Sequence, residues 1–276
     1  MENGSGFLAI GHVTRDGYDD KFRPGGAVYY GSVTAKRLGE SVRVLTSYST
    51  DFHLPVETEG MEWINKLSLE TTTFHNIYSN LRKEDSRTQI LSSLALPITQ
   101  FDVPLDWRNP KIVYLAPVIG EFGPDVASLF LNSKVVASIQ GWTRQQDSDG
   151  KIIIKDWPGI DILSFVDVAV CSHEDIYSED NLKSWIDCVP ILIVTLGRRG
   201  SVIYENGESF HVEAVPNRQV DPTGAGDVYA TSFMIKYIET NDTRRSAKFA
   251  SLVAGMSVCS HGVTSLPYRE TLIDLC

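Results

Sequence analysis

The chain has 276 residues, of which 42% are hydrophobic and 22% charged, the composition of an ordinary globular protein. Its length and composition exclude a disordered chain, a collagen-like repeat and a small disulfide scaffold, and allow one or two domains. The 25 Lys and Arg residues against 35 Asp and Glu residues give a net charge of −10. Because an acidic surface repels phosphate backbones, we expect no nucleic-acid partner.

The N-terminal residues and the apolar runs predict where the protein is located in the cell. Residues 1–6 contain no basic stretch, and the apolar run 7–10 that follows is short for a signal peptide. The longest strongly apolar run, near 189–196, is far below the about 18 residues that a membrane helix needs. We therefore expect a soluble, cytoplasmic protein without a membrane partner.

In the first half of the chain, short β-branched runs alternate with amphipathic segments. The predicted elements, in order, are a strand at 7–11, a helix at 26–38 that stops at Gly39, and a strand at 42–47. Two alternating segments, 73–79 and 88–96, flank the charged turn 82–85 and predict a hairpin. Because this hairpin interrupts the strand–helix rhythm, we expect it to project over the sheet as a small lid.

The second half predicts a buried sheet and then helices. The predicted strands lie at 111–115, 134–139, 168–171 and 191–196, with helices at 123–131 and 181–188 between them. Asn206-Gly207 predicts a tight hairpin between 201–205 and 209–215, and helices follow from near Val228 and over 244–259. This order predicts an α/β fold with a mostly parallel sheet between two helical layers. In such folds, ligands bind beyond the carboxyl ends of the strands.

The segment 221–227, Asp-Pro-Thr-Gly-Ala-Gly-Asp, opens the predicted helix near Val228. Its small residues let a ligand approach the backbone, and the N–H groups at a helix start attract an anion. Phosphoryl transfer needs such a site, because negative charge builds on the transferred group. We expect an anion hole at Gly224, Ala225 and Gly226, and a base at Asp227. A bare G-x-G-D string is equally explained by a tight turn with a helix-end charge, whereas the full string favours the site.

The full 221–227 string closely resembles the signature of the ribokinase-like (PfkB) carbohydrate kinases. The resemblance implies a three-layer ribokinase-like fold, with residues 1–276 as a single kinase domain and a lid hairpin near 73–96. It implies an ATP-dependent kinase that phosphorylates a hydroxyl of a small carbohydrate or polyol. In that reaction, Asp227 is the general base, the amides at 224–226 form the anion hole, and Mg²⁺ is required.

Segments near the N-terminus resemble the acceptor-binding part of that family. Asp16 follows the first strand at the position of the family's sugar-hydroxyl acceptor, and a carboxylate accepts two hydroxyl hydrogen bonds. Gly25 and Gly26 resemble the glycine pair on which the sugar lies. Tyr30 stands where many members carry Asn, and its ring can stack on a substrate or donate a hydrogen bond. This departure makes simple ribokinase specificity doubtful.

Polar residues that follow Tyr30 in the chain narrow the class of acceptor substrate further. On the predicted hairpin, Asn76, Arg87 and Gln89 form a polar row that either binds hydroxyls or is a solvated face. Gln140 and Arg144 follow a buried strand, and Arg144 can pair with a phosphate. The phrase Gln-Gly-x-x-Arg that they frame resembles the plant-type myo-inositol kinase branch. The expected substrate-binding residues are Asp16, Gly25, Gly26, Tyr30, Asn76, Arg87, Gln89, Gln140, Arg144 and Asp227.

The resemblance also implies a donor side. Residues 195–200, Thr-Leu-Gly-Arg-Arg-Gly, resemble the nucleotide-binding strand end, although the string alone is an ordinary strand turn. Ser172 and Asp175 stand where the family has Asn-x-x-Glu, and Ser172 departs from that pattern. The expected nucleotide-binding residues are Thr195, Gly197, Gly200, Ser172, Thr223, Gly224 and Gly226. Asp175 is expected to hold Mg²⁺ through water.

Three further readings stay open. Tyr29 and Tyr30 can line a pocket for a base, which would make the chain a nucleoside kinase. The departures at Tyr30 and Ser172 also fit a catalytically inactive sugar- or nucleotide-binding regulator. A lid hairpin presents an exposed edge, so a homodimer through residues 73–96 is expected.

Overall fold

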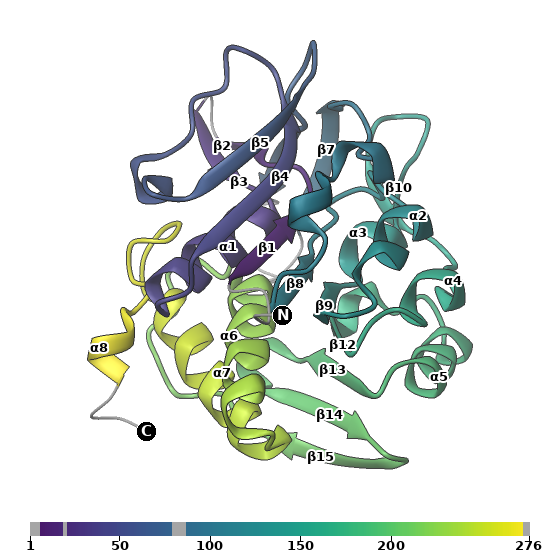
Figure 1. The fold of residues 1–276 in the computed structure, drawn as a ribbon, viewed down its shortest axis with the longest axis vertical. Helices are drawn as coiled ribbons and strands as arrows, with labels where there is room; N and C mark the ends of the chain where they lie inside the picture. Colours follow the sequence, from purple (N-terminus) through teal and green to yellow (C-terminus); the bar gives the residue numbers. More distant parts are fainter. Residues whose placement is uncertain (1–5, 19–20, 79–86, 273–276) are drawn as a thin grey trace.

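The structure is a computed structural model that describes residues 6–18, 21–78 and 87–272. A nine-stranded sheet lies between two helical layers (Figure 1). In spatial order its strands are β15 (Glu208–Val212), β14 (Ser201–Glu205), β13 (Ile191–Thr195), β12 (Val168–Ser172), β9 (Lys134–Ser138), β8 (Ile112–Leu115), β1 (Phe7–Ile10), β4 (Val42–Tyr48) and β5 (Glu62–Leu67).

The central strands run parallel, as predicted. Every neighbouring pair from β13 to β5 is parallel, whereas β14 and β15 add an antiparallel hairpin at one edge. Asn206 and Gly207 form the turn of that hairpin, with positive φ angles of 54° and 78°. The α/β fold with a mostly parallel sheet is therefore confirmed.

Alternate residues of each central strand enter different cores, because side chains alternate across a sheet. Ala9 of β1 lies in one core, whereas Leu8 and Ile10 lie in the other. The helices of the first core are α1 (Ala27–Arg37), α6 (Ala225–Thr240), α7 (Thr243–Ser257) and α8 (Arg269–Leu272). Those of the second are α2 (Pro124–Ala127), α3 (Gln140–Thr143), α4 (Ile160–Leu163) and α5 (Glu179–Cys188). These two cores make the three layers that the sequence predicts.

The lid is a second sheet that lies over one end of the central strands (Figure 1). Its strands, in spatial order, are β3 (Lys21–Gly25), β2 (Thr14–Tyr18), β6 (Thr73–Tyr78) and β7 (Arg87–Ser93). The predicted hairpin is present as β6 and β7, and its charged turn 82–85 lies outside the described residues. The sequence did not predict β2 and β3, which complete the lid sheet beside the hairpin. These two strands are mostly polar and show no apolar alternation.

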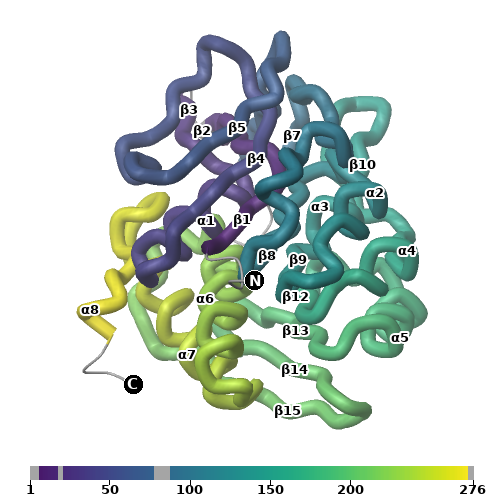
Figure 2. The backbone as a smooth tube through the Cα atoms, viewed as in Figure 1, coloured from purple at the N-terminus to yellow at the C-terminus, as the bar shows by residue number. Residues whose placement is uncertain are grey.

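The C-terminal segment lies beside α1, as the tube in Figure 2 shows. Arg37 at the end of α1 donates hydrogen bonds to the carbonyl oxygens of Val263 (2.7 Å) and Leu266 (2.6 Å). Its guanidinium also lies over the ring of Tyr268, 4.9 Å from the centroid. These contacts fix the segment that follows α7 against the first helix.

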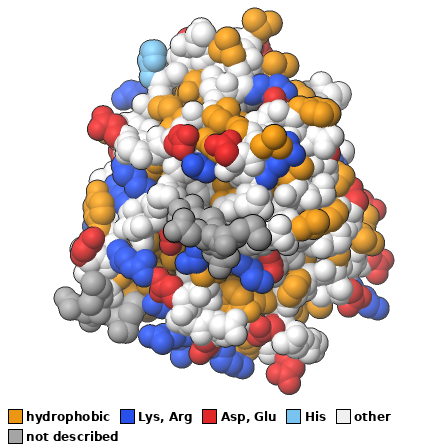
Figure 3. All heavy atoms as spheres, viewed as in Figure 1, with side chains coloured by type: hydrophobic (Ala, Val, Ile, Leu, Met, Phe, Trp, Pro, Cys, Tyr) orange, Lys and Arg blue, Asp and Glu red, His pale blue; other side chains and the backbone are white. Residues whose placement is uncertain are grey.

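Basic and acidic side chains are interspersed on the face drawn in Figure 3. The net charge of −10 is therefore not gathered into one patch on that face. Among the described residues, no helix has both the length and the apolar character needed to span a membrane.

Candidate active site

The 221–227 segment forms a tight turn that leads into α6. Asp221 accepts a hydrogen bond from the Thr223 amide (3.0 Å), and Gly224 then adopts a left-handed conformation with φ 78°. A Cβ on Gly224 would lie 2.3 Å from ring carbons of Tyr30. Only glycine fits this position, because both its φ angle and the close approach of Tyr30 exclude a side chain.

Helix α6 begins at Ala225, three residues before the predicted start. The amide of Ala225 donates to the Pro222 carbonyl (3.1 Å), and the amide of Val228 makes the first helical bond to Gly224 (2.9 Å). The Ala225 amide thus closes the turn in this structure, and its expected place in the anion hole stays a prediction. The amides of Gly226 and Asp227 lie in the first turn, where a helix offers them no backbone acceptor.

Space for a ligand is present above this helix start. A Cβ on Gly226 would meet no heavy atom within 4 Å, and Gly226 is exposed. The positive end of the helix dipole adds to the attraction of an anion here. The N-terminus of α6 therefore presents backbone donors to an open surface beside Asp227.

Asp227 is surrounded by three polar side chains from other elements. The phenol of Tyr114 in β8 donates a hydrogen bond of 2.6 Å to Oδ1 of Asp227. Burial raises the pKa of Asp227 to about 6; Tyr114 and Arg144 oppose the rise, and Asp175 adds to it. A carboxyl with such a pKa is ionised at neutral pH yet accepts a proton readily, which suits a general base.

Arg144 reaches this cluster from a small hairpin. It begins β10 (Arg144–Gln146), which directly follows α3 and pairs with β11 (Ile152–Ile154). Arg144 is 8% exposed, and its charge acts on both Asp227 and Asp175. The hairpin also joins the lid, because Gln146 donates to the Leu91 carbonyl (2.9 Å) and the Leu91 amide donates to Gly150 (2.9 Å). Arg144 thus links the lid to the carboxylates.

Asp175 is buried beside the end of β12. It lies in a short 3₁₀ helix, η5 (His173–Asp175), and its Oδ2 accepts a hydrogen bond from the Ser172 amide (2.7 Å). The Ser172 hydroxyl in turn accepts from the Glu174 amide (3.3 Å). Burial raises the pKa of Asp175, and Arg144 opposes this rise. Both predicted residues therefore form a capping box, which orients the carboxylate.

The side chains near Asp227 determine how the implied magnesium ion would be held. Among the described residues, no group of three or more His, Cys, Asp or Glu side chains gathers as a metal site. Asp175 offers a carboxylate near Asp227 and Arg144. One carboxylate fits Mg²⁺ held mostly by donor phosphates and water, since this ion usually keeps several waters.

Several residues that are predicted to bind the acceptor lie in the lid. Asp16 is 8% exposed and accepts a hydrogen bond from Thr14 (2.9 Å), and Asn76, 7% exposed, accepts from Gln89 (2.9 Å). The Nδ2 donor of Asn76 is buried without a partner in the structure. The β6–β7 register pairs Asn76 with Gln89 and Tyr78 with Arg87, which places the predicted polar row on one face.

Gly25 ends β3 and Gly26 precedes α1, and at both positions a side chain would collide with a neighbouring residue. A Cβ on Gly25 would lie 2.2 Å from Oδ2 of Asp16, and one on Gly26, with φ 93°, would lie 2.4 Å from the His12 carbonyl oxygen. Gly25 therefore makes room for the Asp16 carboxylate. The expected contact of substrate with this pair stays a prediction.

Tyr30 has a different surrounding from the predicted one. Its side chain is 5% exposed, its ring packs against Gly224 and it meets Tyr29 edge-on at 5.4 Å. The ring thus supports the loop before α6. Stacking of this ring on a substrate stays a prediction.

The donor-side residues end neighbouring strands. Thr195 donates to the Cys171 carbonyl (3.1 Å), and Gly197 begins the 3₁₀ helix η6 (Gly197–Arg199) with open space above it. Gly200 has φ 88°, and its Cβ would lie 2.0 Å from the Val212 carbonyl oxygen. A side chain at Gly200 would therefore collide with the backbone of β15, whereas a side chain at Gly197 would meet open space.

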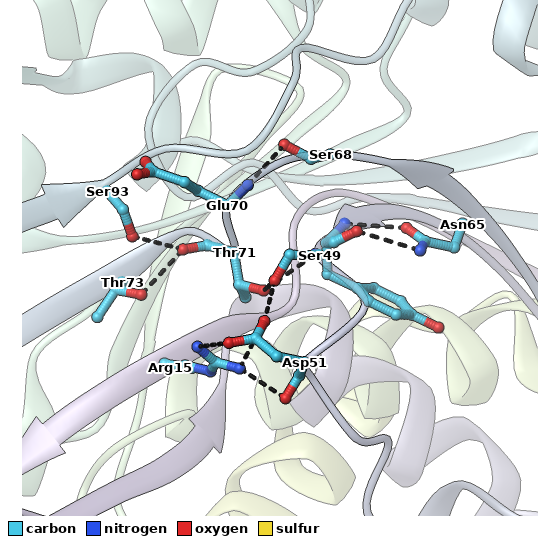
Figure 4. Close-up of polar contacts among 10 residues, drawn as sticks. Arg15, Ser49, Asp51, Asn65, Ser68, Glu70, Thr71, Thr73 and Ser93 are labelled. Carbon is cyan, nitrogen blue, oxygen red and sulfur yellow. Dashed lines mark hydrogen bonds and ion pairs between the residues drawn. The ribbon is translucent and has the colours of Figure 1, made fainter.

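Polar contacts attach the lid to the central sheet (Figure 4). Arg15 of β2 binds the exposed Asp51 beyond β4, with contacts of 3.1 Å to Oδ2 and 2.8 Å to its carbonyl. Ser49 donates to Asp51 and contacts the Thr71 hydroxyl at 3.0 Å. The Thr71 carbonyl accepts from Ser93 of β7 (2.6 Å). These contacts attach both strand pairs of the lid, β3–β2 and β6–β7, to the segment that follows β4.

Sequence reasoning missed two buried groups near the site. Tyr114 stands inside an apolar strand, where the only signal was that a buried phenol needs a partner. His12 is fully buried, accepts from Thr72 (2.8 Å) and donates to the Leu96 carbonyl (2.9 Å). Its amide donates to Glu121 (2.9 Å). Nothing in the sequence links these distant residues.

Comparisons with known proteins show a family similarity and a shared fold. Residues 167–270 match the model of the pfkB family carbohydrate kinases. A solved structure, described as a pyrophosphate-dependent kinase in the ribokinase family complexed with a pyrophosphate analog and myo-inositol, has a TM-score of 0.78. At 23% identity, that match covers 96% of this chain and 98% of the other chain. Over residues 167–270 the chain is similar to these kinases, and its fold is ribokinase-like.

Two curated relatives match this chain over shorter stretches. A nucleoside kinase of Methanothermobacter thermautotrophicus is 38% identical over 78 residues, which is 28% of this chain and 25% of the relative. A 5-dehydro-2-deoxygluconokinase of Mesomycoplasma hyopneumoniae is 25% identical over 205 residues, 71% of this chain and 52% of the relative. The matched stretches span a quarter to about half of these relatives.

Proposed function

We propose that this chain transfers the γ-phosphoryl group of ATP to a hydroxyl of a small polyol or sugar, with a cyclitol such as myo-inositol as the preferred acceptor. One observation carries the proposal. Asp227, with a pKa of about 6, stands in the first turn of α6 beside helix-start amides that face open space. A base and an anion site on one helical turn are the two parts that this reaction needs.

The proposed reaction follows from this juxtaposition. The acceptor O–H bond breaks as its proton moves to the Asp227 carboxylate, and the acceptor oxygen forms a bond to the γ-phosphorus. The bond from that phosphorus to the bridging oxygen of ADP breaks, and ADP keeps the electron pair. The amides of Gly226 and Asp227 stabilise the transferred group, and Arg144 adds positive charge beside the carboxylates. Bound Mg²⁺ would neutralise phosphate charge, with Asp175 holding its water.

The lid favours a polyol as acceptor. Asp16 offers carboxylate acceptors, whereas Asn76 offers a buried donor, so the two recognise different partners on neighbouring hydroxyls. The solved structure that matches almost all of this chain was complexed with myo-inositol, which supports a cyclitol. That structure is described as pyrophosphate-dependent, so the donor needs to be tested as well.

A nucleoside kinase is the second candidate, and the similarity to the archaeal nucleoside kinase favours it. A catalytically inactive sugar- or nucleotide-binding regulator is the third. Against the regulator stands the complete 221–227 segment, with its base and open helix start.

A ligand screen followed by turnover separates these candidates. The purified chain is heated with myo-inositol, ribose, adenosine or cytidine, each with a non-hydrolysable ATP analogue, because a ligand of the native state raises the midpoint. Stabilising acceptors are then offered with ATP or pyrophosphate and Mg²⁺. We expect a cyclitol or sugar to be phosphorylated. Phosphorylation of nucleosides alone supports the second candidate, and stabilisation by a ligand with no phosphorylation of any acceptor supports the third.

Replacing Asp16 with Asn tests the acceptor site. We expect the KM for the acceptor to rise roughly tenfold to a hundredfold, because a hydrogen bond to a charged group is lost. The KM for the donor is expected to stay within about threefold, since Asp16 belongs to the lid. Steady-state kinetics with each substrate varied measure both constants. The matched control is Asp106→Asn, an exposed carboxylate that precedes the amino end of β8. Equal changes in both KM values would contradict the assignment.

We also propose a homodimer through the lid. Phe22 and Ile77 of the lid are 55% and 51% exposed, and the β2 register places them on one face. That face differs from the one that carries Asp16 and Asn76. We expect light scattering at micromolar concentration to give the mass of a dimer, and Ile77→Glu to give a monomer. A monomeric wild-type chain overturns this proposal.

A further inference from the structure

Tyr114 lies inside the core and touches the proposed base. It belongs to β8, where its backbone is paired with Ala9 of β1 and Val136 of β9, and its side chain is fully buried. Its hydroxyl donates a hydrogen bond of 2.6 Å to Oδ1 of Asp227. A buried phenol whose one donor is spent on a carboxylate makes a short, charge-assisted contact.

The surroundings hold the Tyr114 ring in place. A Cβ on Gly31 of α1 would lie 2.4 Å from a ring carbon, so the glycine makes the space that the ring fills. The ring also packs against Phe7, with centroids 6.4 Å apart. Because α1 and the sheet fix the ring, the hydroxyl reaches Asp227 from one direction only.

We propose that Tyr114 is a positioning residue for the phosphoryl-transfer base: it holds Oδ1 of Asp227, so that the other carboxylate oxygen is presented to the acceptor hydroxyl. This inference rests on the proposed function. In the reaction, the acceptor proton goes to the free oxygen of Asp227, and Tyr114 keeps its own proton.

The charges around Asp227 agree with this role. The groups that face it are Tyr114 from β8, Arg144 from β10 and Asp175 from η5. Burial and the nearby Asp227 charge raise the pKa of Tyr114 well above its usual value, so the phenol remains a donor. The Ser138 hydroxyl of β9 bonds to the same phenol and lowers its pKa, which strengthens the donor. The Tyr114 bond also lowers the pKa of Asp227 against the effect of burial.

The test is Tyr114→Phe, which removes one hydroxyl and keeps the ring. We expect kcat at neutral pH to fall about tenfold, because a hydrogen bond to a charged group is lost from the base. The acid limb of kcat/KM is expected to move to higher pH, because Asp227 loses a contact that lowers its pKa. The acceptor KM is expected to change little. A merely structural tyrosine would not move the acid limb.

Tyr229→Phe is the matched control. Tyr229 lies two residues further along α6, is buried, and bonds to Ser201 (2.9 Å) rather than to a carboxylate. We expect it to leave the acid limb in place. If Tyr114→Phe does not fold, Ser138→Ala provides the second variant, with a smaller shift of the limb in the same direction.

A measurement without substrate separates this inference from the proposed function. Carbon NMR of the Asp227 carboxyl, assigned with Asp227→Asn, follows its titration directly. A midpoint near 6 in the wild type that rises in Tyr114→Phe supports the inference even if no acceptor is phosphorylated. An unchanged midpoint overturns it, although Asp227 can still be the base. Turnover that Asp227→Asn leaves intact overturns the proposed function instead.

Discussion

The Asp227→Asn variant is expected to lose at least about a hundredfold in kcat, because an amide cannot take the acceptor proton. ATP affinity is expected to stay within about threefold, since the amides at the start of α6 and the strand end at Gly197 remain. Single-turnover assays measure the chemical step, and calorimetry measures the nucleotide. The loss should persist at every pH, whereas wild-type kcat/KM should fall as the pH drops through about 6, where Asp227 becomes protonated.

The control for this variant is Asp161→Asn. Asp161 is an exposed carboxylate in the first turn of α4, on the opposite face of the sheet from α6. Asp161→Asn makes the same change of charge and size as Asp227→Asn but at a position on that opposite face. The kinetics of Asp161→Asn should therefore equal those of the wild type. Near-normal turnover in Asp227→Asn would remove Asp227 from the reaction.

The Gly224→Ala variant is expected to lose both stability and activity. Its φ of 78° costs an alanine about 1–2 kcal/mol, and the contact of 2.3 Å with Tyr30 adds about 1–3 kcal/mol of overpacking. If the loop moves to relieve the clash, the helix-start amides move with it. A displacement of this kind can lower kcat about a hundredfold. Urea unfolding and steady-state kinetics measure the two losses.

Gly207→Ala separates the two causes. Gly207 also has φ 78°, in the β14–β15 turn, but a Cβ there would meet nothing within 4 Å. We expect this variant to lose only the stability that a positive φ costs an alanine, about 1–2 kcal/mol, and to keep its activity. Equal destabilisation of both variants would mean that the Tyr30 contact carries no energy. Unchanged kcat in Gly224→Ala would show that the loop position does not matter for turnover.

Much of the central fold was predictable because its signals are local. The buried strands β8, β9, β12 and β13 are short β-branched runs, and the Asn206-Gly207 turn carries its own conformational preference. Strands β2, β3, β5, β10 and β11 escaped prediction. The lid strands are mostly polar, and β5 is an edge strand without a clear apolar run.

The candidate site was predictable only where its residues are contiguous. The 221–227 segment carries the proposed base Asp227, the glycines and the helix start in one string. The start of α6 at Ala225, and the use of the Ala225 amide by Pro222, depend on the geometry of the turn. The contact between the Tyr30 ring and Gly224 depends on the packing of α1 against α6.

The sequence by itself determined the layered α/β fold and predicted a base and an anion site at one helix start, because periodicity and a seven-residue string are local properties. Only the tertiary structure decided what surrounds that base. Tyr114, Arg144 and Asp175 come from three separate elements, and β8, the β10–β11 hairpin and the end of β12 bring them to Asp227. Burial and charge at a carboxylate depend on groups that are distant in sequence. The pKa of about 6 is therefore a property of the fold.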